Sequence, residues 1–252
     1  HPRVRRQRQM CIRDRFFLRK HPHDNVAYLA YFQAGSNTYM PLSVMQCYIS
    51  QALSVPGVRG IVLATRPDCL STSWLDYLEH LSRQTFVMVE LGIESVNDDV
   101  LRQIGRGHDV ATSAQAVRQL HLRGIHVGVH FILGLPGESR ESQLQQAFEA
   151  SRWKVDSVKL HQLQILRGSR FARQYAEFPE RFSLFSLPDY VSLVADFIER
   201  LHPAIAVERF VSQSPASLLI APRWGVKPDE VVRLVCSTLA ERRTQQGILC
   251  PL

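Results

Sequence analysis

The chain has 252 residues, 45% of them hydrophobic and 21% charged, which suffices to bury the core of one large domain. Thirteen glycines and 13 prolines exclude a collagen-like or low-complexity chain, and no apolar run reaches the roughly 20 residues that span a bilayer. No apolar stretch follows the basic N-terminus as a secretory signal would require, so we expect a cytoplasmic protein without a membrane partner.

The net charge of +7 is concentrated at the N-terminus. Residues 1–20 carry eight basic side chains and one acidic side chain, which is the whole excess, and the other residues hold 22 of each sign. The first 15 residues, HPRVRRQRQMCIRDR, show no apolar periodicity. We therefore predict that residues 1–15 form a basic leader that is disordered or foreign to the fold. An arm for nucleic acid is the alternative.

The five cysteines are scattered along the chain, with no two within four residues of each other. This spacing excludes a disulfide framework and a local metal site, because zinc and iron–sulfur motifs place their ligands a few residues apart. We expect Cys47, Cys69 and Cys236 to be small buried residues.

Strands and helices alternate from residue 26 onward. Short apolar, β-branched runs predict strands, and segments with helical spacing predict the helices between them. The predicted strands are 26–33, 58–65, 86–93, 125–133 and 157–165, and the predicted helices are 42–53, 73–84, 97–104, 110–123 and 139–154. Strand centres lie about 30 residues apart, the length of a strand–helix–strand crossover, which predicts a parallel sheet in a doubly wound fold or a barrel with parts missing.

The pattern changes after residue 165. We predict helices at 170–176, 189–201 and 227–243 and one more strand at 205–211. The chain thus divides into the leader at 1–15, an α/β part at 16–168 and an α-rich extension at 169–252 that packs on it.

Small and polar residues follow the predicted strands, and in parallel α/β folds the loops at these strand ends hold the ligand. Small residues let a ligand approach the backbone, and carboxylates suit ribose hydroxyls. The sequence contains no GxSxG motif, and no predicted helix carries paired histidines. This inventory favours a nucleotide-like pocket over a hydrolase site.

Six segments make the chain recognisable when taken together and in order: YLAYFQAGSNTY, ATRPD, VELGIES, IGRGHD, HFILGLPGE and VKLHQLQILRGS. They resemble an uncharacterised bacterial subfamily of the radical SAM superfamily, related to the Elongator catalytic subunit and to oxygen-independent coproporphyrinogen dehydrogenase. The resemblance covers residues 16–243. It implies an α/β fold, a partial (β/α)6 TIM-like barrel of the radical SAM type with its first strand missing.

The resemblance also implies how the methionyl end of S-adenosylmethionine would be bound. Ala34, Gly35 and Ser36 match the loop that receives the ammonium group. An aromatic residue is expected at position 35 in this family, so the glycine is a departure that suggests a roomier loop. Arg106 matches an arginine that pairs with the carboxylate, although it also fits a solvated loop arginine.

The adenosine end is assigned in the same way. Glu94 matches a polar residue that contacts the ribose, and capping of the next helix is the alternative. His130 falls at an adenosine contact but also fits a core histidine. The segment from Ile132 to Gly134 matches the strand edge that hydrogen-bonds adenine through its backbone. A ribose-binding glutamate of some relatives is replaced here by Ala64.

Several further residues lie on the same strands and loops. His108, Lys159 and His161 resemble family positions on the substrate side, with roles left open. Strand alternation places Glu90 on the same face as Glu94, so we expect it to point into the barrel.

The sequence lacks the CxxxCxxC loop that holds the four-iron, four-sulfur cluster of this superfamily. We interpret the chain as a fragment of an enzyme that cleaves S-adenosylmethionine reductively to a 5′-deoxyadenosyl radical, using an electron donor and acting on an unknown substrate. A natural clusterless paralogue is the alternative explanation for the missing loop. We expect that this chain cannot bind the cluster and is inactive alone. The rival function is that of a non-enzymatic, RNA-binding barrel protein with an Arg-rich arm.

Overall fold

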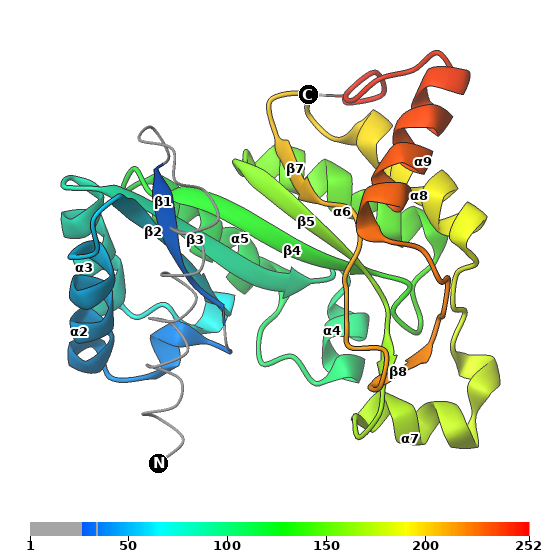
Figure 1. The fold of residues 1–252 in the computed structure, drawn as a ribbon, viewed down its shortest axis with the longest axis horizontal. Coiled ribbons are helices and arrows are strands. Elements are labelled where there is room, and N and C mark those ends of the chain that lie inside the picture. The colour runs from blue at the N-terminus through cyan, green and yellow to red at the C-terminus, as the bar shows by residue number, and fades with distance from the viewer. Residues whose placement is uncertain (1–26, 34, 252) are drawn as a thin grey trace.

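The computed structural model describes residues 27–33 and 35–251. The predicted leader and Ala34 lie outside them. Six parallel strands form one twisted sheet in the order β1-β2-β3-β4-β5-β7 (Figure 1). Their bounds are β1 (Tyr28–Phe32), β2 (Val58–Thr65), β3 (Phe86–Glu94), β4 (His126–Leu133), β5 (Ser157–Gln162) and β7 (Ala206–Arg209). The sheet curls into a half-barrel, which confirms the predicted partial TIM-like barrel.

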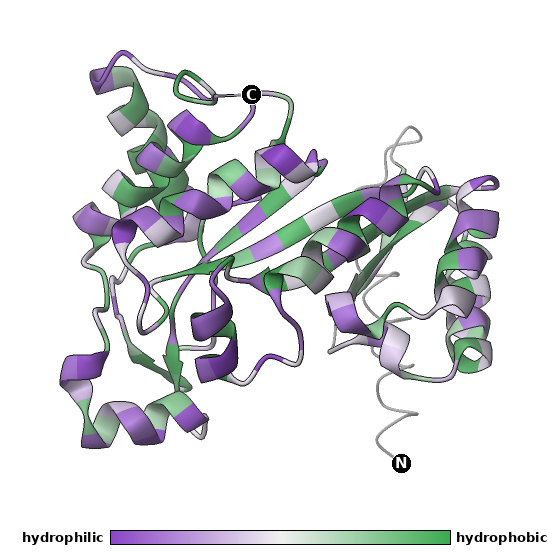
Figure 2. Cartoon of the chain, turned by 180° about the vertical axis from the view of Figure 1, so that it is seen from behind, coloured by the Kyte–Doolittle hydropathy of each residue, from purple (hydrophilic) through white to green (hydrophobic). Residues whose placement is uncertain are grey.

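Each predicted crossover helix is present. The helices are α2 (Leu42–Leu53), α3 (Thr72–Ser82), α4 (Asp98–Ile104), α5 (Val110–His121) and α6 (Arg140–Trp153), and short 3-10 turns η1 (Asn37–Tyr39) and η2 (Pro67–Cys69) follow β1 and β2. Polar N-caps define the helix starts: Asn97 accepts hydrogen bonds at the head of α4, and Ser139 does so for α6. Figures 1 and 2, from opposite sides, agree that α5 and α6 cover the same face of the sheet.

Alternation along the strands separates the core from the concave face. On β3, Val87, Val89, Leu91 and Ile93 are buried against the helices, and Glu90 lies on the opposite, concave face. Figure 2 shows the same division, with largely hydrophobic strands and helices banded by polar residues. The concave face is therefore free to carry polar chemistry.

The C-terminal part adds α7 (Arg170–Glu177), η3 (Pro179–Arg181), α8 (Leu187–Arg200), β8 (Leu219–Ala221) and α9 (Pro228–Glu241). The strand predicted at 157–165 is in fact broken: β5 ends at Gln162, and β6 (Ile165–Leu166) pairs antiparallel with β8. Three residues were too few for the sequence to predict β8. The predicted strand at 205–211 is β7, which becomes the sixth strand of the main sheet although it belongs to the extension.

Two smaller findings complete the fold. Cys47 and Cys236 are exposed and Cys69 is half-buried, so the prediction that these three are buried was wrong. Each exposed cysteine lies on a surface helix, which the alternation of the strands did not reveal. Within the described part of the chain, no helix is long and apolar enough to cross a membrane.

Candidate active site

The loop after β1 is fixed by the side chain of Asn37. Its amide nitrogen donates to the carbonyl oxygen of Phe32 at 2.9 Å and to that of Ala64, on β2, at 2.7 Å. Gly35 has φ +72°, a conformation that favours glycine, and a side chain there would meet no atom of the described residues within 4 Å. Asn37, to which sequence reasoning gave no role, thus ties this loop to the ends of β1 and β2.

Glu94 and Arg106 lie together at the carboxyl end of β3. The Arg106 guanidinium donates to the Gly92 carbonyl and lies 3.5 Å from a Glu94 carboxylate oxygen. A side chain on Gly92 would come within 2.9 Å of that oxygen, so glycine makes room for the pair. Glu94 itself has φ +73°, a strained conformation for a non-glycine residue. The strand bulges here, which turns the carboxylate over the end of the sheet.

The surroundings of Glu94 affect both its pKa and its capacity to accept hydrogen bonds. Burial raises the pKa of Glu94, and the positive charge of Arg106 opposes that rise. At 3.5 Å the ion pair is longer than a hydrogen bond, so Glu94 keeps acceptor capacity for a hydroxyl group. Glu94 does not appear among the hydrogen-bonded caps of α4, where Asn97 accepts instead.

His108 lies behind Arg106. Nε of Arg106 donates to Nε2 of His108 at 3.2 Å, and Nδ1 of the same ring is 3.2 Å from Oγ of Ser113. Burial, assisted by the charge of Arg106, lowers the pKa of His108, which keeps the ring neutral and able to accept. His108 therefore positions Arg106.

The backbone at the carboxyl end of β4 depends on a glycine, Gly134. The β3–β4 ladder ends at the pair Glu94 and Phe131. From Ile132 onward β4 no longer pairs with β3, although Ile132 and Leu133 still pair with β5. Gly134 has φ +92°, and a side chain there would meet the ring of Phe185 at 2.9 Å. Its N–H is held by Oε1 of Gln143 at 2.9 Å. This part of β4 lies beside β3, the strand that carries Glu94.

Glu90 is the centre of a polar cluster on the concave face. One carboxylate oxygen accepts from the Tyr31 hydroxyl at 2.6 Å and lies 2.9 Å from Nε2 of His130, and the other accepts from the Lys159 ammonium. Burial opposes ionisation, but the hydrogen bonds from His130, Lys159 and Tyr31 prevail and lower the pKa of Glu90 to about 2. Lys159 also lies 3.3 Å from Glu208. The cluster joins side chains from β1, β3, β4, β5 and β7.

The Glu90 cluster bears on the predicted adenosine contact of His130. Its Nε2 atom lies 2.9 Å from Oε2 of Glu90, so an adenosine contact through that nitrogen would have to displace this contact. His161 stacks near it, with ring centroids 5.3 Å apart. Burial lowers the pKa of His161 to about 3, Nδ1 bonds to Ser212, and its buried Nε2 has no partner among the described residues.

Metal ligands do not gather in the described part of the chain. No group of three histidine, cysteine or acidic side chains there is arranged to hold a metal ion, and Cys47, Cys69, Cys236 and Cys250 are all free. The described residues therefore offer no donor set that fits a four-iron cluster.

Comparisons with known proteins agree with this geometry. The radical SAM superfamily model matches residues 28–145, and the radical SAM C-terminal domain model matches residues 155–241. The chain is 36% identical over 220 residues to the uncharacterized protein YtqA of Bacillus subtilis, covering 87% of this chain and 68% of that protein. It is 34% identical over 198 residues to YhcC of Escherichia coli K12, covering 78% and 63%.

More distant relatives have longer chains. Human Elongator complex protein 3 is 28% identical over 164 residues, which cover 64% of this chain and 29% of that protein. The structure of the archaeal Elp3 of Methanocaldococcus infernus superposes with a TM-score of 0.79 at 18% identity, covering 91% of this chain and 57% of that one. The chain spans about two thirds of the length of the bacterial relatives. From the family matches and the half-barrel together, we conclude that the chain belongs to the radical SAM superfamily.

Proposed function

We propose that the carboxyl edge of β1, β3 and β4 is the S-adenosylmethionine site of a radical SAM enzyme. The observation that carries the proposal is the Glu94–Arg106 pair on Gly92, beside the stretch of β4 from Ile132 onward that no longer pairs with β3. In this family, S-adenosylmethionine bound with an iron–sulfur cluster and an electron donor supplies a 5′-deoxyadenosyl radical. The protein's own task is to bind and orient the cofactor and to exclude water.

Each residue of the edge has a distinct proposed role. Glu94 accepts a hydrogen bond from a ribose hydroxyl. Arg106, oriented by His108, meets the methionyl carboxylate, because a planar guanidinium can bind both oxygens. Gly35 and Ser36 leave room for the ammonium group, and the segment from Ile132 to Gly134 presents backbone groups to adenine.

The Glu90 cluster is proposed as the substrate side of the same site. Tyr31, His130 and Lys159 are already bonded to Glu90, so the concave face offers a fixed polar surface that needs little reorganisation. His161 presents the one buried ring nitrogen of this face that is unpartnered within residues 27–33 and 35–251. We propose that it accepts a hydrogen bond from the substrate, whose identity is unknown.

We further propose that these 252 residues do not assemble the cluster alone, because no three cysteines are close in the sequence. Iron and sulfide content after anaerobic reconstitution tests this. A stoichiometric four-iron cluster would contradict it, and background iron would support it.

The test of the cofactor site compares S-adenosylmethionine with 5′-deoxyadenosine, which lacks the carboxylate. Without the cluster we expect weak binding, with a Kd on the order of millimolar. Arg106→Gln should weaken S-adenosylmethionine alone, and Glu94→Gln should weaken both ligands. Arg102→Gln, on the exposed face of α4, is the charge-matched control. Equal losses of both ligands in Arg106→Gln would refute the assignment of the carboxylate.

A further inference from the structure

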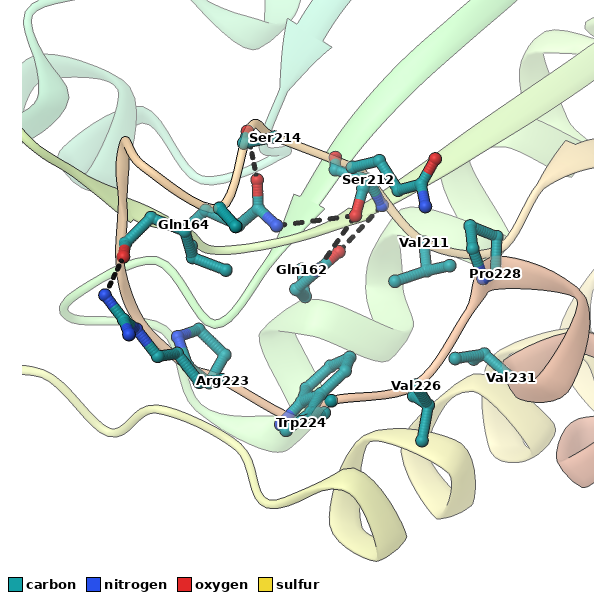
Figure 3. A pocket seen from close by; sticks show the side chains of 15 residues that line it. Gln162, Gln164, Val211, Ser212, Ser214, Arg223, Trp224, Val226, Pro228 and Val231 are labelled. Atoms are coloured by element: carbon teal, nitrogen blue, oxygen red, sulfur yellow. Dashed lines mark hydrogen bonds between the residues drawn. The ribbon is translucent and has the colours of Figure 1, made fainter.

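A cavity lies at the carboxyl edge of the sheet, past the ends of β5 and β7. It has a volume of about 310 Å³, within the usual range of small-molecule sites. The segment that follows β7 runs around it, and Gln162, the last residue of β5, and Gln164 close it on the sheet side (Figure 3). None of the residues proposed for S-adenosylmethionine lines it.

Two side-chain amides in this cavity are held in fixed orientations. Gln162 pairs with the backbone of Ser212 in both directions: its Oε1 accepts from the Ser212 N–H at 2.8 Å, and its Nε2 donates to the Ser212 carbonyl at 3.1 Å. Oε1 of Gln164 accepts from the Ser214 hydroxyl at 2.6 Å. A primary amide has two N–H groups and two lone pairs, so each keeps a donor and an acceptor in reserve.

The opposite wall is apolar and is anchored in the core. Trp224 donates its indole N–H to the Phe185 carbonyl at 3.0 Å, and its ring centroid is 5.0 Å from that of Tyr190. Val226 and Val231 continue this wall towards α9 (Figure 3). An aromatic wall facing fixed amides suits a flat ring with donors and acceptors on its edge.

Charge in the cavity has one sign. Arg223 is the only charged side chain among the described residues that line it. Its guanidinium donates to the Leu219 carbonyl at 2.7 Å, and it forms no ion pair within the described part of the chain. Such an arginine at an open rim suits a phosphate, which it can bind through two N–H groups.

We propose that this cavity is a nucleotide-binding site, with the base between Trp224 and the amides of Gln162 and Gln164 and the phosphate at Arg223. An apolar anion would offer no hydrogen-bonding groups to the amides of Gln162 and Gln164. An uncharged base would offer no anion to Arg223. A free mononucleotide and a single nucleotide unit of an RNA strand share this chemistry. The proposal does not depend on the S-adenosylmethionine site.

The experiment titrates the four nucleoside 5′-monophosphates, the matching nucleosides, inorganic phosphate and a short single-stranded RNA, and follows the Trp224 indole signal by NMR. Arg223→Gln should weaken a monophosphate at least tenfold and leave its nucleoside unchanged, whereas Gln164→Leu should weaken both. Arg233→Gln, an exposed arginine of α9 outside the cavity, is the charge-matched control. Thermal unfolding verifies that each variant folds.

The outcomes are distinct. If a mononucleotide binds and Arg223→Gln weakens it, the ligand is a free nucleotide. If only the RNA binds and Arg223→Gln weakens it, the ligand is a nucleotide unit of an RNA strand. Glu94→Gln should leave both unchanged, which separates this site from the proposed cofactor site. Absence of binding by every probe would overturn the proposal. So would binding that Arg223→Gln does not affect, or inorganic phosphate binding as tightly as the nucleotides.

Discussion

Two carboxyl groups of the same half-barrel, those of Glu90 and Glu138, are both withdrawn from water, yet their surroundings shift their pKa values in opposite directions. Glu90, on the concave face, is met by Tyr31, His130 and Lys159, and its pKa falls to about 2. Glu138, in the turn after β4, is also buried, but burial prevails there and raises its pKa to about 7. Burial alone therefore does not decide ionisation; the donors around the carboxyl do.

The surroundings of Glu138 explain the difference. Its Oε1 accepts from the Ser95 hydroxyl and from Nε2 of Gln146, both neutral donors. No cation of the described residues pairs with it, and Oε2 of Glu138 and Oε1 of Gln146 are buried without partners there. The concave face thus carries an ionised carboxylate with charged and polar partners, whereas the carboxyl group in the turn next to the proposed adenine edge retains its proton up to a pH of about 7.

Removing the cation from the Glu90 cluster should have the largest effect. We expect Lys159→Met to lower the free energy of unfolding by about 3–5 kcal/mol, because it leaves a buried carboxylate without its ammonium partner. Adding Glu90→Gln should restore part of that loss. Urea unfolding measures both.

The control for this pair is Arg102→Met. Arg102 pairs with Asp99 on α4, where the two side chains are 69% and 87% exposed, so the loss should stay below about 1 kcal/mol. If Lys159→Met costs no more than Arg102→Met, the cluster does not hold an ionised Glu90.

The pH dependence of stability should separate the two carboxyls. Because the pKa of Glu138 is raised from 4.5 to about 7, the folded state binds more protons than the unfolded state between these values, and stability falls as pH rises through this window. Glu138→Gln should abolish that fall and offer an N–H to the unpartnered Gln146 oxygen. Relative to the wild type, the free energy of unfolding of Glu138→Gln should be higher at pH 8 than at pH 4 by an amount on the order of 2–3 kcal/mol.

Glu90 should show the opposite sign. Its pKa is lowered from 4.5 to about 2, so its stabilising effect is complete above pH 4.5 and is lost as pH falls towards 2. Thermal unfolding of the wild type and of Glu138→Gln across pH 4–8 measures the fall in stability with rising pH that we predict for Glu138. A difference between the two proteins that does not change with pH would show that Glu138 is not protonated in the folded state.

Glu94 lies between these extremes, and ligand binding reports its charge. Since burial raises the pKa of Glu94, affinity for 5′-deoxyadenosine should fall on acidification at a higher pH than an ordinary glutamate would give. Glu94→Ala should weaken binding about tenfold or more, with no dependence on pH. Equilibrium dialysis between pH 5 and 8 tests this, and an unchanged affinity in the variant would remove Glu94 from the site.

The smallest effect is expected at the other end of the chain. Residues 1–15 are charged and aperiodic, so deleting them should shift the melting temperature by no more than about a degree or two. If the alternative of a nucleic-acid arm holds, the same deletion should abolish RNA binding and its salt dependence. A large loss of stability would show that the leader packs on the fold.

Much of the fold could be predicted from the sequence because the crossovers are regular. The helix at 42–53 and the strand at 58–65 have the predicted bounds, since proline, glycine and strand-period apolar runs mark their ends. The break after Gln162 and the short β8 could not be predicted, because two- and three-residue strands carry no periodicity.

The site was only partly predictable. Strand alternation placed Glu90 inside the barrel, but its partners Tyr31 and Lys159 come from strands 59 and 69 residues away. The pairing of Glu94 with Arg106 likewise depends on a bulge and a close approach to Gly92. Such contacts arise from the tertiary fold, so a single sequence does not reveal them.

The most direct test of the proposed cofactor site is an NMR titration of the protein with 5′-deoxyadenosine. We predict that the shifted amide signals map to Glu94 and to the segment from Ile132 to Gly134, and that Glu94→Ala diminishes them. Shifts that map elsewhere on the half-barrel, or that persist unchanged in Glu94→Ala, would contradict an adenosine site at the carboxyl ends of β3 and β4.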